Sequence, residues 1–128
     1  MKILVADANS TFRKSLCRFL QDRFPAATVR SSKTQGLIRE VREFSPEIII
    51  LEANFAYLRK IRGQLAGARI IMLTPHDLPE YIEAGSKYGA DQVFCKDKVG
   101  EPEIQDLIEI ISREVRGPET LPEGGGYK

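Results

Sequence analysis

The sequence predicts an α/β protein built on a doubly wound, five-stranded parallel sheet. Short runs of β-branched and aliphatic residues alternate along the chain with longer segments whose apolar residues recur at helical spacing. The run Pro46–Glu52 contains four consecutive aliphatic residues, which is typical of a central strand buried on both faces. Right-handed crossovers between parallel strands then place helices on both faces of the sheet.

The N-terminal half predicts three strands and two helices in alternation. The strands are expected at residues 2–6, 27–31 and 46–52, and the helices at about 11–24 and 34–44. Asn9 or Ser10 can cap the first helix through a side-chain oxygen, and Pro25 ends it. This helix is expected to bury four apolar residues: Phe12, Leu16, Phe19 and Leu20. Its charged residues are expected to face water: Arg13, Lys14, Arg18 and Asp22.

The C-terminal half continues the alternation. Strands are expected at residues 69–73 and 92–95, and helices at about 53–65, 79–88 and 101–115. Gly67 is expected to close the first of these helices and Gly89 the second, because glycine adopts positive φ without strain. Pro79 suits the first turn of its helix, where the missing N–H costs nothing.

Composition sets broad limits on the protein. The 128 residues are 42% hydrophobic and 29% charged, which favours one globular domain, expected at residues 1–116, with a flexible tail at 117–128. We expect a cytoplasmic protein without membrane contact, since no apolar run has the length of a membrane span or a signal peptide. Cys17 and Cys95 are too far apart to suggest a zinc site and are expected to be small buried residues. A net charge of +1, with basic residues not interleaved with aromatics, argues against direct binding of nucleic acid.

Four polar residues directly follow four different predicted strands. They are Asp7, Glu52, Thr74 and Lys96. The carboxyl ends of the strands in an open α/β sheet meet at one crevice, where ligands bind, so we expect these side chains to form the functional site. A purely structural alternative is that Lys96 pairs with Asp7 or Glu52 to neutralise charge there.

These stretches together resemble the receiver domain of two-component response regulators, over about residues 1–116. Ile3-Leu4-Val5-Ala6-Asp7 resembles the first strand and its acidic pair, and Pro46–Glu52 resembles the strand that carries the phosphorylated aspartate. Ile71-Met72-Leu73-Thr74 resembles the strand with the switch hydroxyl. The segment from Gly89 to Asp97 resembles the glycine-alanine-aspartate turn and the lysine that contacts the phosphoryl group, here Lys96. The resemblance implies a flavodoxin-like (βα)5 fold, a role in phosphorelay signalling rather than as an enzyme, and a histidine kinase or output protein as partner.

Three positions depart from the pattern of that family. Ala8 stands where the second magnesium-binding acid is expected, Glu52 where the phosphoaccepting aspartate is expected, and Val93 where the aromatic switch residue is expected. Mg²⁺ prefers near-octahedral oxygen ligands, so losing one acid and lengthening another should weaken its site. The extra methylene also lets the Glu52 carboxylate reach Lys96 or Thr74, where a phosphoryl oxygen would otherwise lie.

The resemblance implies that any Mg²⁺ would be held by Asp7, Glu52 and the carbonyl of Asn54, and we expect this site to be weak or lost, with no cofactor. We therefore expect a stand-alone receiver that acts as a phosphorylation-independent interaction module. One alternative is a receiver that still binds Mg²⁺ and accepts phosphate from a histidine kinase. Another is a flavodoxin-like domain that binds a small molecule.

The resemblance also implies a partner surface on the fourth helix, fifth strand and fifth helix. Its candidate residues are Tyr81, Tyr88, Lys98, Val99 and Glu101. Tyrosines are effective interface anchors, although these two could equally be half-buried core residues. A homodimer through this face is one expectation. Since the tail at 117–128 is too short for an output domain, we expect output to pass through a partner.

Overall fold

The structure is a computed structural model that describes residues 1–65, 67–75, 78–96 and 109–113. The chain divides into two compact units, Met1–Asp97 and Lys98–Lys128. The first unit contains the sheet and its helices, and in the second unit residues 109–113 are helical. The rest of the helix expected at 101–115 lies outside the described residues, as does the whole tail expected at 117–128, so the predicted domain limits stay a prediction.

In the first unit, strands and helices alternate as the sequence predicts. The strands are β1 (Lys2–Ala6), β2 (Thr28–Ser32), β3 (Ile48–Glu52), β4 (Arg69–Thr74) and β5 (Gln92–Cys95). The helices are α1 (Ser10–Arg23), the 3-10 turn η1 (Thr34–Gly36), α2 (Leu37–Phe44), α3 (Phe55–Gln64) and α4 (Pro79–Tyr88). These bounds lie within two residues of the predicted ones, except that the second helix begins as a 3-10 turn.

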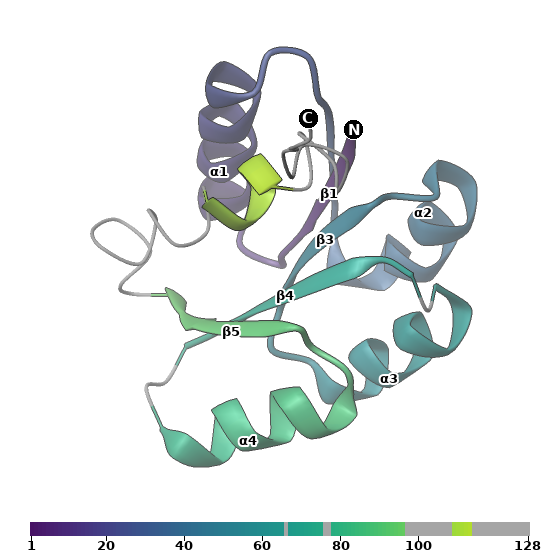
Figure 1. Cartoon of the computed structure of the whole chain (residues 1–128), viewed down its shortest axis with the longest axis vertical. Helices are drawn as coiled ribbons and strands as arrows, with labels where there is room; N and C mark the ends of the chain where they lie inside the picture. Colours follow the sequence, from purple (N-terminus) through teal and green to yellow (C-terminus); the bar gives the residue numbers. More distant parts are fainter. Residues whose placement is uncertain (66, 76–77, 97–108, 114–128) are drawn as a thin grey trace, which may run out of the picture. The chain divides into compact units, whose positions relative to one another are not determined.

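The described strands form one all-parallel, five-stranded sheet in the order β2-β1-β3-β4-β5 (Figure 1). The predicted fold class is therefore confirmed. Helices α2, α3 and α4 lie along one face of the sheet and α1 along the other (Figure 1). Strand β3 is central, and Ile48 to Leu51 are at most 1% exposed, as expected for a strand covered on both faces.

The helix ends have identifiable caps. The Asn9 side chain accepts a hydrogen bond from the N–H of Phe12 at 2.9 Å, so Asn9 rather than Ser10 caps α1. Gly89 ends α4 with φ of 119°, as predicted. The prediction for Gly67 is wrong: α3 ends at Gln64, and Leu65 caps it by donating its N–H to the carbonyl of Ile61. The chain turns from α3 to β4 without needing a glycine directly after the helix.

Two residues of α1 differ from their predicted environments. Arg13 was expected to face water but is 7% exposed, and Phe19 was expected to be buried but is 38% exposed. The Arg13 guanidinium reaches back along the helix and donates to the carbonyl of Asp7 at 2.5 Å. Arg13 therefore continues the buried line of Leu16 and Leu20, and Phe19 lies at its rim.

The two cysteines, Cys17 and Cys95, are free thiols and are half-buried rather than fully buried. Burial raises the pKa of the Cys17 thiol, while the positive charge of Arg13 opposes this rise. A raised pKa leaves less reactive thiolate near neutral pH. Within the described residues, no helix has the length and hydropathy needed to cross a membrane.

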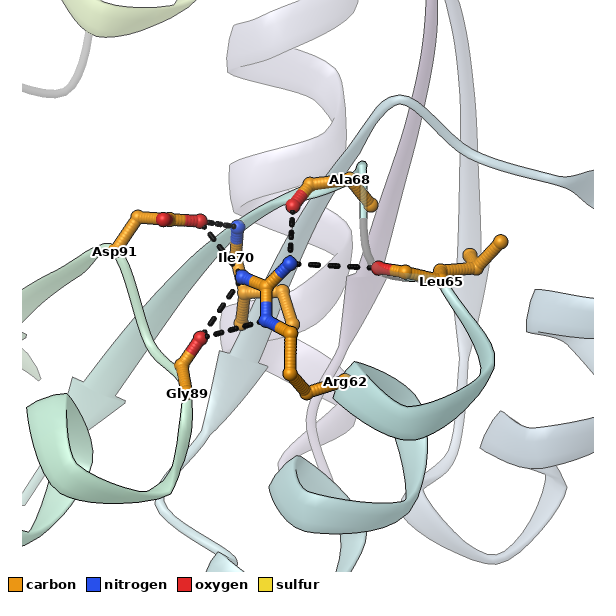
Figure 2. A network of polar contacts seen from close by, with 6 residues as sticks. All are labelled: Arg62, Leu65, Ala68, Ile70, Gly89 and Asp91. Carbon is orange, nitrogen blue, oxygen red and sulfur yellow. Dashed lines mark hydrogen bonds and ion pairs between the residues drawn. The ribbon is translucent and has the colours of Figure 1, made fainter.

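A polar network centred on Arg62 ties the helices to the amino-terminal ends of β4 and β5 (Figure 2). The guanidinium donates two hydrogen bonds to the carbonyl of Gly89, at 3.0 and 2.8 Å, and one to the carbonyl of Ala68 at 2.8 Å. It also lies 2.8 Å from the carboxylate of Asp91, which in turn accepts the N–H of Ile70 at 2.8 Å. This network lies at the opposite end of the strands from Asp7 and Glu52, where it links α3 to the end of α4 and to the starts of β4 and β5.

Candidate functional site

The strand register brings the predicted site residues to one edge of the sheet. Ala6 pairs with Leu51 across β1 and β3, so the residues that follow them, Asp7 and Glu52, leave the sheet side by side. Thr74 pairs with Cys95 across β4 and β5, and Lys96 follows directly. All four side chains therefore start from the carboxyl ends of their strands, where ligands of doubly wound sheets bind.

Asp7 and Lys96 form a largely buried ion pair. The Lys96 Nζ lies 2.8 Å from Asp7 Oδ2 and 3.0 Å from Oδ1, and the Asp7 side chain is only 2% exposed. The backbone N–H of Asn9 donates a further hydrogen bond to Oδ1 at 2.8 Å. On its other side the ammonium lies 4.4 Å from the centroid of the Phe12 ring, within the range of a cation–π contact. Carboxylate and ring together fix the position of the ammonium.

The Glu52 carboxylate makes a different contact from the predicted one. It accepts a hydrogen bond from the backbone N–H of Ala8, and the ion pair of Lys96 is with Asp7 instead. The physical reason is that the loop after β1 exposes a backbone N–H beside the end of β3, within reach of a glutamate side chain. The contact joins the end of β3 directly to the loop between β1 and α1.

Burial raises the pKa of Glu52 above its ordinary value of 4.5. The neighbouring Asp7 carboxylate raises it further, whereas the Ala8 N–H and the Lys96 ammonium oppose the rise. A carboxyl whose pKa is higher in the folded state stabilises the fold most below pH 4.5, and this contribution is lost as the pH rises through its folded pKa. Charged Glu52 is therefore unfavourable beside Asp7 at neutral pH.

Replacing Glu52 with glutamine is expected to raise the unfolding free energy at neutral pH by less than about 1 kcal/mol, because solvent screens this partly exposed side chain. The amide keeps an acceptor for the Ala8 N–H and removes the charge repulsion with Asp7. The gain in unfolding free energy should grow as the pH rises above 4.5, as measured by urea denaturation at several pH values. Glu43→Gln, an exposed change on α2, is the control. A Glu52→Gln gain that shrinks with rising pH would contradict the sign of this shift.

Comparison with known proteins finds similarity to response regulators. No family model matches the chain. A nitrate/nitrite response regulator protein homolog of Haemophilus influenzae is 31% identical over 129 aligned positions, which cover 94% of this chain and 60% of that protein. The chain is similar in sequence to response regulators over nearly its whole length. It spans about 60% of the length of that relative.

Solved structures agree on the receiver fold. The receiver domain of a DNA-binding response regulator from Colwellia psychrerythraea superposes with a TM-score of 0.74 at 20% identity, covering 85% of this chain and 98% of that one. A response regulator from Burkholderia pseudomallei, solved with a phosphorylated aspartic acid, a calcium ion and citrate, gives a TM-score of 0.72 at 20% identity. It covers 91% of this chain and 75% of that one. The recognition made from the sequence is confirmed.

Asn54 of this receiver domain is engaged in starting α3. Its side-chain oxygen accepts the N–H of Tyr57 at 3.1 Å, and its carbonyl accepts the N–H of Leu58 at 2.9 Å. Both oxygens thereby satisfy backbone donors of the first helical turn. Among the described residues, no cluster of three or more His, Cys, Asp and Glu could hold a metal ion.

The residues predicted for the receiver switch and for the partner surface differ in how deeply they are buried. Thr74 is 1% exposed at the end of β4, and Val93 is half-buried on β5. Tyr81 and Tyr88 are half-buried on α4, and both rings contact Phe55. The remaining residues predicted for the partner surface lie outside the described part of the chain: Lys98, Val99 and Glu101. A partner role for this surface stays a prediction.

Three contributors to the site were not found from the sequence. They are the backbone N–H of Ala8, the ring of Phe12 and the guanidinium of Arg13. A backbone donor carries no side-chain signal, so Ala8 was read only as a missing acid. Phe12 and Arg13 lie on the first turns of α1, one turn beyond Asp7, and that proximity to a strand end was the only available signal.

Proposed function

We propose that this receiver domain is a protein-interaction module of two-component signalling whose state does not depend on phosphorylation. The observation that carries the proposal is the contact between Glu52 and Ala8. The phosphoacceptor-equivalent side chain is a glutamate, and its carboxylate binds the backbone N–H of the loop after β1. A direct protein contact thus joins two segments that a metal and a phosphoryl group would otherwise connect.

The residues present do not fit a Mg²⁺ site. Both carboxylate oxygens of Asp7 lie within 3.0 Å of the Lys96 ammonium, so a divalent cation bound to them would face a positive charge at close range. Ala8 supplies no carboxylate, and both oxygens of Asn54 already accept hydrogen bonds from α3. Mg²⁺ requires several well-placed oxygen ligands, so these contacts support a site without metal.

Phosphoryl transfer to Glu52 is also unfavourable. Transfer depends on positioning and on electrostatic stabilisation of the phosphoryl oxygens, most of which a metal ion supplies. The glutamate carboxylate extends one methylene further than an aspartate would, which displaces the attacking oxygen from an in-line position. The similar structure from Burkholderia pseudomallei carries its phosphate on an aspartic acid. At position 52 this chain has no aspartate to modify.

The proposed output is contact with a signalling protein, either a histidine kinase or an output protein. The proposal concerns the receiver domain itself, and its partner can be on the same polypeptide or on another. We propose the α4 side of the domain as the contact surface, since Leu78 and Ile82 are exposed there and Tyr81 is half-buried beside them. A cytoplasmic location follows from this role as part of the same proposal.

A magnesium titration of the Ala8→Asp/Glu52→Asp double variant beside the wild type tests the proposal. Restoring both acids should create saturable Mg²⁺ binding, seen as amide shifts at the carboxyl ends of β1 and β3, while wild-type shifts stay unsaturated at millimolar Mg²⁺. Glu43→Asp, an exposed change on α2, is the control and should behave like the wild type. Saturable binding by the wild type would instead favour a receiver that still binds Mg²⁺ and accepts phosphate. A copurified organic ligand would favour the flavodoxin-like alternative.

A further inference from the structure

Three of the contacts between described residues attach helix α4 to the rest of the first unit near its start, middle and end. They are an aromatic contact to α3, a close approach of a glycine to the sheet, and a hydrogen-bonded end at Gly89. We infer that these three attachments hold α4 in one position, so that its outer surface is displayed constantly, whatever the state of the strand-end site. This inference rests on the proposed function and specifies how the domain would stay in one signalling state.

The aromatic attachment begins close to the strand-end site. Phe55 is the first residue of α3 and follows Glu52 by three positions. Its ring stacks on Tyr81 with centroids 6.1 Å apart and an interplanar angle of 19°, and lies 5.8 Å from the ring of Tyr88. Tyr81 is near the start of α4 and Tyr88 is its last residue, so one ring contacts both ends of the helix.

The second attachment is in the middle of the helix. Gly85 is the buried residue of α4, and a Cβ added there would lie 2.7 Å from Met72 Cε and 2.7 Å from Val93 Cγ2. The backbone of α4 therefore lies close against side chains of β4 and β5, and a larger residue at position 85 would require Met72 and Val93 to shift. Val93, at the position of the aromatic switch, lies against Gly85 and is half-buried.

The third attachment is at the carboxyl end of α4. The Gly89 carbonyl accepts two hydrogen bonds from Arg62 (Figure 2). The Gly89 N–H donates to the carbonyl of Gly85 at 3.1 Å. A helix fixed at its start, middle and end cannot shift or rotate without breaking contacts of three different kinds. Leu78, which precedes α4, and Ile82 on α4 are 44% and 46% exposed. With α4 held in this way, these two apolar residues keep one arrangement.

Amide hydrogen exchange on the full chain tests this inference. In the wild type, α4 amides should be protected to the same level as those of β3, because no local opening of α4 precedes unfolding. Gly85→Ala should increase the exchange rates of α4 amides by a factor roughly ten times larger than that for β3 amides. The reason is that the added Cβ loosens α4 locally and leaves β3 in place. Gly63→Ala is the matched control: Gly63 is a helical glycine on α3 with nothing within 4 Å of an added Cβ, and exchange in α4 should not change.

A second variant covers the case in which Gly85→Ala does not fold. Phe55→Leu removes both ring contacts without inserting atoms and should also loosen α4 selectively. Equal acceleration in α4 and β3 in the variants, or weak protection of α4 in the wild type, would overturn the inference.

The same samples with Mg²⁺ and beryllofluoride, read by fluorine NMR, distinguish the two proposals. Bound beryllofluoride with unchanged protection of α4 would contradict the proposed function alone, whereas loosened α4 would overturn the inference.

Discussion

Replacing Arg62 with alanine is expected to lower the unfolding free energy by about 3 kcal/mol. The change removes the ion pair with Asp91 and the hydrogen bonds to the carbonyls of Gly89 and Ala68. The Gly89 carbonyl, at the end of α4, and the Ala68 carbonyl, just before β4, would each lose a charged hydrogen-bond donor. Asp91 would lose its counter-ion. We place the effect at the lower end of the range for buried pairs, because the Arg62 and Asp91 side chains are 24% and 33% exposed. Urea denaturation measures the loss directly.

Arg59→Ala is the matched control for this prediction. Arg59 is an exposed arginine on the same helix, and its described contact is with the ring of Tyr88 at 5.4 Å. Its removal should cost less than about 1 kcal/mol. Arg62→Lys should lose most of the stabilisation, because a lysine keeps the charge but cannot donate to the four acceptors that surround the planar guanidinium. Equal effects for Arg59→Ala and Arg62→Ala would contradict a specific network.

Replacing Lys96 with alanine is the second change with a large expected effect, also about 3 kcal/mol. It leaves the carboxylate of Asp7 nearly buried with a hydrogen bond from Asn9 but without its counter-ion, and it removes the contact with the Phe12 ring. Lys14→Ala, an exposed change on α1, should cost much less. The loss is measured by urea denaturation at neutral pH.

A double-mutant cycle with Asp7→Asn identifies the partner of Lys96. If Asp7 is that partner, the cost of Lys96→Ala should fall by at least about 1 kcal/mol in the Asp7→Asn background. In the Glu52→Gln background the cost should change much less, because the Glu52 carboxylate binds the Ala8 N–H. A stronger coupling of Lys96 to Glu52 than to Asp7 would contradict the ion pair between Lys96 and Asp7.

The sheet could be predicted because its signals are local. The aliphatic run of β3, the positive φ of Gly89 and the cap of α1 each depend on neighbours in the chain. The first two were located from the sequence, and Asn9 was one of two candidates for the cap. The meeting of Asp7 and Glu52 followed from topology alone, since parallel strands end at the same edge.

The contacts within the site could not be predicted, because they depend on side-chain reach and on backbone donors. Lys96 pairs with Asp7 rather than Glu52, and Glu52 binds the Ala8 N–H, although either carboxylate was a plausible partner from the sequence. The Arg62 network was missed for a similar reason: its acceptors are mostly backbone carbonyls, which every residue provides. Arg13 was misplaced because a long side chain can bury its stem and still reach a polar acceptor.

The central claim is that Glu52 does not accept a phosphoryl group. The most direct test treats the wild-type chain with acetyl phosphate and Mg²⁺ and then measures its intact mass. The mass should stay unchanged, while the Ala8→Asp/Glu52→Asp variant should gain the mass of one phosphoryl group under the same conditions. An acid-labile phosphoryl group on wild-type Glu52 would contradict the central claim.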